Sequence, residues 1–94
     1  MTLETLRERR AEVLEIARRR GAKAVWVFGS VARGEATPAS DIDFLVEFEP
    51  GRSLLDQVHL IDELGSLLGT PVEVVAKGGL LERDHHILAE AVPL

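Results

Sequence analysis

Residues 41–49 alternate between acidic and apolar side chains, and this stretch constrains the fold more than any other part of the chain. Its even positions are all apolar, whereas its odd positions are acidic except for Leu45. A period of two is that of a β-strand with one buried face. Asp41 and Asp43 therefore leave the backbone on the same side, roughly 6.6 Å apart, where two carboxylates repel each other unless a cation lies between them.

The composition is that of one folded domain. The 94 residues are 46% hydrophobic and carry a net charge of −5, which argues for a packed globule and against passive adhesion to nucleic acid. There is no cysteine, which excludes disulfides and thiolate chemistry. The charged start MTLETLRERR has no apolar signal region, and no later run could span a bilayer. We therefore expect a single-domain (1–94) cytoplasmic protein with no membrane contact and no direct nucleic-acid binding.

The rest of the chain predicts alternating helices and strands. Helices are expected at 3–20, 53–68 and 80–91, strands at 24–28, 42–48 and 72–76, and a further edge strand at 92–94. Residues 29–40 form a long turn region with room for one helical turn at 31–33. This order predicts an α/β domain (α+β in the wider sense) built on a small mixed sheet.

The helix at 53–68 has the clearest pattern. Ser53 and Asp56 have the spacing of a capping box, and Gly69 followed by Pro71 provides a stop. Apolar residues at helical spacing predict the stripe that packs on the sheet: Leu54, Val58, Ile61, Leu64 and Leu68.

Gly29 and Ser30 follow the first strand directly and are candidates for binding phosphate. A glycine at a strand end permits a sharp turn and a close approach of a ligand to the backbone. The amides that follow, with the Ser30 hydroxyl, make an anion-binding nest if a helical turn begins there. Arg33 would add donors suited to phosphate oxygens. The alternative is an ordinary turn with a surface arginine.

Asp41, Asp43 and Glu73 are candidates for a metal site. Two carboxylates on one strand face can reach a pair of divalent cations, as in in-line nucleotidyl transfer, and oxygen ligands suit Mg²⁺ or Mn²⁺. The alternative is a solvated edge strand, which the acids at 47 and 49 support. Glu73 lies in an otherwise apolar strand and supplies a third acid, able to bind a metal or accept the proton of an attacking hydroxyl.

These motifs resemble a known family. The run VFGSVARGEATPASDIDFLV, followed by Glu73, is similar to the minimal nucleotidyltransferases (MNT) of the DNA polymerase β-like superfamily, and the resemblance extends through the closing ILAEAV segment. It implies a mixed sheet with helices packed mainly on one face. It also implies site roles: Asp41, Asp43 and Glu73 binding two Mg²⁺ ions, and Gly29, Ser30, Arg33 and Ser40 contacting ATP. The third acid of such proteins is often aspartate, and the extra methylene of glutamate would loosen the metal geometry.

The resemblance also implies a partner. Larger relatives carry a further domain that holds the acceptor, and this chain stops after the catalytic core, so we expect another protein to hold it. In the MNT group the partner is typically a HEPN-domain ribonuclease, which the MNT antitoxin neutralises by transferring AMP from ATP to a tyrosine. We therefore expect a hetero-oligomeric toxin–antitoxin pair.

Two other hypotheses remain open. The chain could inhibit its partner by binding alone, with apolar surface near Leu80, Leu81 and Ile87 as the interface. It could instead transfer a nucleotide to a small molecule in a homodimeric cleft. For the enzyme, we expect labelled AMP on the partner that is lost with Asp43→Asn. For the binding module, we expect inhibition that survives Asp41→Asn and no incorporation of nucleotide.

Overall fold

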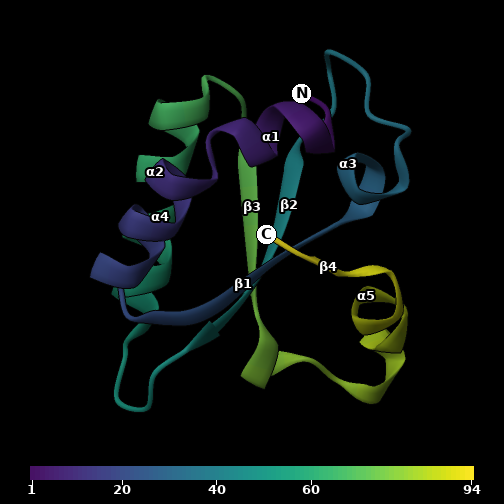
Figure 1. Cartoon of the computed structure of the whole chain (residues 1–94). Coiled ribbons are helices and arrows are strands. Elements are labelled where there is room, and N and C mark those ends of the chain that lie inside the picture. Colours follow the sequence, from purple (N-terminus) through teal and green to yellow (C-terminus); the bar gives the residue numbers. More distant parts are fainter.

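The computed structural model describes all 94 residues and places four strands in one mixed sheet (Figure 1). Strands β1 (Ala22–Phe28), β2 (Ile42–Phe48), β3 (Val72–Ala76) and β4 (Val92–Pro93) lie in the spatial order β3-β2-β1-β4. β2 runs antiparallel to β1 and parallel to β3, and β4 pairs antiparallel with β1. The predicted mixed sheet is confirmed, and β2 is an inner strand rather than a solvated edge.

Three helices cover one face of this sheet. Helices α1 (Leu3–Glu8), α2 (Arg10–Arg19) and α4 (Leu54–Leu68) share one apolar core with the even positions of β2. Helix α2 packs against β1 and α4 against β3, and the two helices lie side by side at the left of Figure 1. The main core formed there includes Phe44 and Leu64, both fully buried. The apolar half of the alternation in β2 therefore faces the helices, and its acidic half faces the opposite side.

The predicted helix at 3–20 is wrong in one respect, because the structure interrupts it at Arg9. This residue leaves helical geometry (φ −104°, ψ 15°), and its guanidinium donates to the Leu67 carbonyl near the end of α4 at 3.2 Å. No glycine or proline marks the break, so the local pattern contains no signal for it. Gly21 follows α2 in the left-handed conformation, with a φ of 85°, as the sequence predicts.

The predicted apolar stripe of α4 is wrong in its first half. Leu60, Leu64 and Leu68 are buried, whereas Leu54 is 73% exposed and Val58 is 50% exposed. The first turn presents Gln57 to the sheet instead, and its Nε2 donates to the Val74 carbonyl at 2.9 Å. The capping box that precedes this turn is confirmed.

The other face of the sheet carries a smaller apolar cluster and the C-terminal elements. Phe28, Leu45 and Ile87 form this cluster, which explains why Leu45 interrupts the acidic positions of β2. The predicted helix at 80–91 is only half correct: 3₁₀ turns at Lys77–Gly79 and Glu82–Asp84 precede a short helix α5 (His85–Glu90). Because Ile87 is buried, the interface predicted around it is not a continuous exposed apolar surface.

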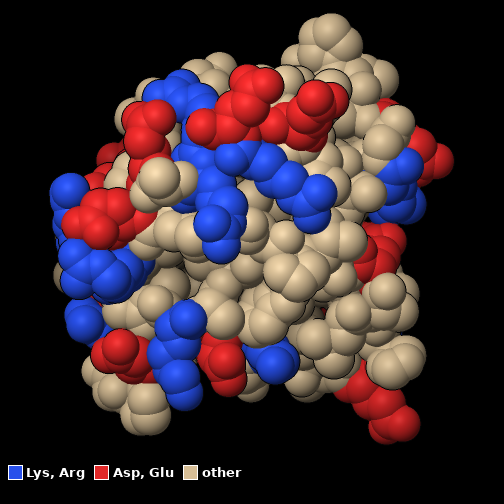
Figure 2. Space-filling model, in the orientation of Figure 1, with Lys and Arg blue, Asp and Glu red and all other residues tan.

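Charged side chains of both signs interleave over α2 and α4, toward the left of Figure 2. Within this region Arg18 pairs with Glu15 at 2.8 Å, and Arg9 pairs with Glu12 at 3.0 Å. None of the helices is both long enough and apolar enough to cross a bilayer.

Candidate functional site

Gly29 brings the predicted phosphate-binding turn into contact with the predicted metal ligands. β1 ends at Phe28, which pairs with Asp43 on β2, and the five-residue helix α3 (Gly29–Arg33) starts at once. Gly29 has a φ of 73°, and a Cβ atom there would lie 2.1 Å from Asp43 Oδ2. Only glycine tolerates both the backbone conformation and this approach.

Asp43 and Glu73 are brought together by strand pairing. They are register partners on the parallel strands β2 and β3, so both side chains lie on the face away from the main helices. Asp43 is half-buried and Glu73 is exposed. Burial, then the charge and hydrogen bonding of Glu73 and the charge of Asp41, raise the pKa of Asp43 to about 6, while Arg33 opposes the rise.

This carboxylate set fits a divalent cation by its chemistry. All donors are oxygens, and the pKa of Asp43 is raised first by burial and then by the negative neighbours Glu73 and Asp41, whose charge a cation would neutralise. Asp41 is exposed in the loop that precedes β2. No three His, Cys, Asp or Glu side chains are gathered closely enough to hold an ion between them, so a metal would bind through adjustment of the exposed acids, Asp41 and Glu73.

Glu90, which sequence analysis missed, accepts hydrogen bonds from the donors of the predicted phosphate-binding turn. Its Oε1 accepts from the Gly29 N–H at 2.9 Å, and the Arg33 Nη1 donates to its two oxygens at 3.3 and 3.1 Å. Against the effect of its own burial, the Gly29 hydrogen bond and Arg33 hold the pKa of Glu90 below its ordinary value. Arg33 Nε also donates to Glu35 at 2.7 Å.

The two predicted serines are placed differently. Ser30 is half-buried in the first turn of α3, and its carbonyl accepts from the Glu35 N–H at 2.8 Å. Ser40 closes a local turn, because its Oγ accepts from the Thr37 N–H at 2.9 Å and lies 3.2 Å from the Thr37 hydroxyl. Ser40 therefore shapes the loop that leads to Asp41, while Ser30 stands beside Gly29 at the site.

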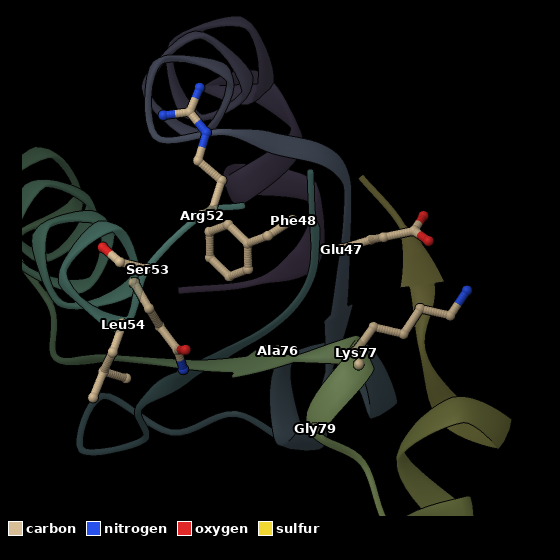
Figure 3. A pocket seen from close by; sticks show the side chains of 10 residues that line it. Glu47, Phe48, Arg52, Ser53, Leu54, Ala76, Lys77 and Gly79 are labelled. Carbon is tan, nitrogen blue, oxygen red and sulfur yellow. The ribbon is translucent and has the colours of Figure 1, made fainter. Parts of the chain in front are cut away.

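A cavity of about 590 Å³ lies at the opposite ends of β2 and β3. Figure 3 shows Ser53 and Leu54 at the start of α4 on one side and Glu47 and Lys77 on the other. The Lys77 ammonium also lies 4.9 Å from the centre of the Trp26 ring. None of the predicted site residues lines this cavity, so we locate the candidate site by Gly29 and the acids instead.

The sequence and the fold correspond to a known family. The sequence profile described as a nucleotidyltransferase domain matches residues 10–90, and the mixed sheet with its helices matches the polymerase β-like nucleotidyltransferase fold. The chain belongs to the nucleotidyltransferase domain family, and it is a nucleotidyltransferase.

Similar proteins define its place within that family. The chain is 43% identical over 89 residues to a candidate protein adenylyltransferase of Methanocaldococcus jannaschii, covering 93% of this chain and 95% of that protein. It is 46% identical over 66 residues to the protein adenylyltransferase MntA of Thermococcus cleftensis, covering 70% of this chain and 67% of that protein.

Solved structures agree with the fold. A candidate minimal nucleotidyltransferase has a TM-score of 0.88 and 54% identity, covering 100% of this chain and 97% of that chain. A tri-AMPylated HEPN toxin of Shewanella oneidensis in complex with its MNT antitoxin has a TM-score of 0.67 and 16% identity, covering 88% of this chain and 66% of that chain. The second likeness concerns the fold alone.

Proposed function

We propose that the chain is an Mg²⁺-dependent protein adenylyltransferase that transfers AMP from ATP to a tyrosine of a HEPN ribonuclease and so acts as its antitoxin. The observation that carries the proposal is the contact of Gly29 with Asp43, which brings a phosphate-binding turn against the acids of two paired strands. The similarity to the adenylyltransferases of Methanocaldococcus jannaschii and Thermococcus cleftensis supports protein as the acceptor. The proposed class of partner follows from the sequence resemblance to the minimal nucleotidyltransferases, and the Shewanella antitoxin is an example of this fold in complex with a HEPN toxin.

The residues have distinct roles in this proposal. Gly29, Ser30 and Arg33 bind and orient the triphosphate. Asp41, Asp43 and Glu73 would hold the cations, whose contribution would be to neutralise negative charge on the phosphate oxygens. The tyrosine oxygen bonds to the α-phosphorus, the bond from that phosphorus to the bridging oxygen breaks, and pyrophosphate leaves.

In this proposal Glu73 also accepts the tyrosine proton. It is exposed at the edge strand β3, where an acceptor from another protein can approach, whereas Asp43 is half-buried beside Gly29. A carboxylate that is open to the acceptor is suited to accept its proton, and the more enclosed one is suited to hold the cation.

The test is transfer of α-labelled AMP to a purified HEPN partner with wild type, Asp43→Asn and the control Glu49→Gln. Glu49 is an exposed acid just beyond the far end of β2, so its variant has the same change in charge outside the site. We expect label on the partner with wild type and control, and none with Asp43→Asn. Full transfer by Asp43→Asn would overturn the proposed roles.

Inhibition by binding alone is the second candidate, and an exposed apolar patch favours it. Leu54, Leu55 and Val58 at the start of α4 are 73%, 60% and 50% exposed, and three such neighbours form a patch, which isolated surface leucines do not. Here inhibition of the ribonuclease survives Asp41→Asn and no nucleotide is incorporated. Inhibition that disappears together with AMP transfer rejects this candidate.

A further inference from the structure

The carboxylate of Glu90 fills the position at which the proposed function places phosphate. It accepts a hydrogen bond from the Gly29 N–H at 2.9 Å and pairs with Arg33 at 3.1 Å, and only 24% of its side chain is exposed. An anionic oxygen bound by a backbone amide and a guanidinium uses the same donors that a phosphate oxygen would use. The two anions cannot occupy these donors together.

Arg33 offers no net positive charge to a phosphate group while both of its present partners remain. Glu35 lies 2.7 Å from its Nε and Glu90 lies 3.1 Å from its Nη1. One guanidinium between two carboxylates leaves a local charge of minus one, which repels an incoming phosphate. Departure of one carboxylate restores neutrality, and Glu90 is the one that also blocks the Gly29 amide.

The segment that carries Glu90 is attached in a way that permits this departure. Helix α5 has six residues and contributes a single buried side chain, Ile87, to the small cluster with Phe28 and Leu45, apart from the main core. The residues after α5 are fixed separately, because β4 pairs with β1 and the Leu94 N–H donates to the Val25 carbonyl at 3.1 Å. The helix can therefore move while β4 stays in the sheet.

We propose that Glu90 is an internal placeholder for the phosphates, so that nucleotide binding displaces its carboxylate from Gly29 and Arg33 and releases α5 from the sheet. This inference rests on the proposed function, because it assumes that these donors receive the triphosphate. It adds a regulatory role: any partner that holds α5 away from Gly29 raises nucleotide affinity, and any partner that presses it down lowers nucleotide affinity.

The first experiment measures the Kd of AMP-PNP with Mg²⁺ by calorimetry for wild type, Glu90→Gln and the control Glu82→Gln. Glu82 is an exposed acid of the same segment for which no contact with Gly29 or Arg33 is present. Loss of one charge-assisted competitor tightens binding to Glu90→Gln about tenfold. Glu82→Gln keeps the wild-type Kd. An equal or weaker affinity of Glu90→Gln overturns the placeholder, whereas absence of binding in all three proteins overturns the proposed function itself.

The second experiment needs no variant and follows backbone hydrogen exchange in the wild-type protein. Addition of AMP-PNP with Mg²⁺ speeds exchange in residues 85–90 and leaves exchange in α4 unchanged or slower. A purely structural Glu90 gives the opposite result, because a ligand that binds beside a fixed helix slows its exchange. Slower exchange in α5 at saturating nucleotide therefore contradicts the proposal even where Glu90→Gln fails to fold.

Discussion

Replacing Asp43 by asparagine is expected to stabilise the fold at neutral pH, although it removes a residue of the site. Asp43 has a pKa of about 6 in the folded protein, above its ordinary value of 3.8, because of burial and then the acids Glu73 and Asp41. The folded state therefore binds its proton more tightly than the unfolded state does. The contribution of Asp43 to stability therefore falls as the pH rises from about 4 to about 6 and stays at the lower level above that range.

The magnitude follows from the size of the rise in pKa. A difference of roughly two pKa units corresponds to about 3 kcal/mol as an upper bound, and solvent screening of the half-exposed carboxylate reduces it to about 1 kcal/mol. The asparagine side chain does not titrate, so the free energy of unfolding of Asp43→Asn should exceed that of wild type by about 1 kcal/mol at pH 7. The corresponding rise in Tm is about 4–8 °C for a domain of this size.

Urea unfolding of wild type, Asp43→Asn and Glu49→Gln between pH 4.5 and 7.5 tests this expectation. The difference between wild type and Asp43→Asn should grow with pH and level off above about pH 6, because the Asp43 carboxyl titrates in that range and the asparagine that replaces it does not. Glu49→Gln removes the same charge from an exposed position and should show no such growth. A difference that is absent at pH 7, or that does not depend on pH, would refute the reasoning.

Three further outcomes are expected. Gly29→Ala should lower the free energy of unfolding by about 2 kcal/mol or more and abolish AMP transfer. The control Gly34→Ala should cost only about 1 kcal/mol, because Gly34 has a similar φ of 74° but nothing lies within 4 Å of the added Cβ. Equal losses in urea unfolding would contradict the contact of Gly29 with Asp43. In the same assay, Leu64→Ala should lower the free energy of unfolding by about 2–5 kcal/mol and Leu54→Ala by less than about 0.5 kcal/mol, because Leu64 is fully buried and Leu54 is 73% exposed. Similar losses for the two variants would contradict the packing of α4. AMP-PNP with Mg²⁺, at a hundredfold excess over its Kd, should stabilise wild type by about 2.7 kcal/mol in a thermal melt and Asp41→Asn by much less. An unchanged Tm of wild type would count against the proposed nucleotide site.

The strands were predictable because their patterns are local. The strands at 42–48 and 72–76 have the predicted bounds, since an apolar or alternating run lies between turn residues in each case. The break at Arg9 and the exposure of Leu54 were not predictable in this way. Both depend on where one helix lies against another or against the sheet, which periodicity within a single helix does not encode.

The candidate site was likewise predictable from the sequence only in part. Gly29, Asp43 and Glu73 could be selected from residue type and order, but their proximity depends on a register that pairs Phe28 with Asp43 and Asp43 with Glu73. Glu90 had no distinguishing signal, because a lone acid at the end of a short amphipathic helix reads as a solvated residue. Its contact with Gly29 spans 61 positions in the sequence.

The position of β3 at the edge of the sheet has a consequence for solubility. Its sequence VEVVA is β-prone, and no strand pairs with its outer side, where Gln57 binds only the Val74 carbonyl. Separate molecules can join their sheets through such an edge and aggregate. Glu73 is the only charged residue within this strand, and it is exposed. Glu73, the acid proposed for proton transfer, therefore also opposes self-association through this edge. Selection for solubility and selection for chemistry act on the same side chain.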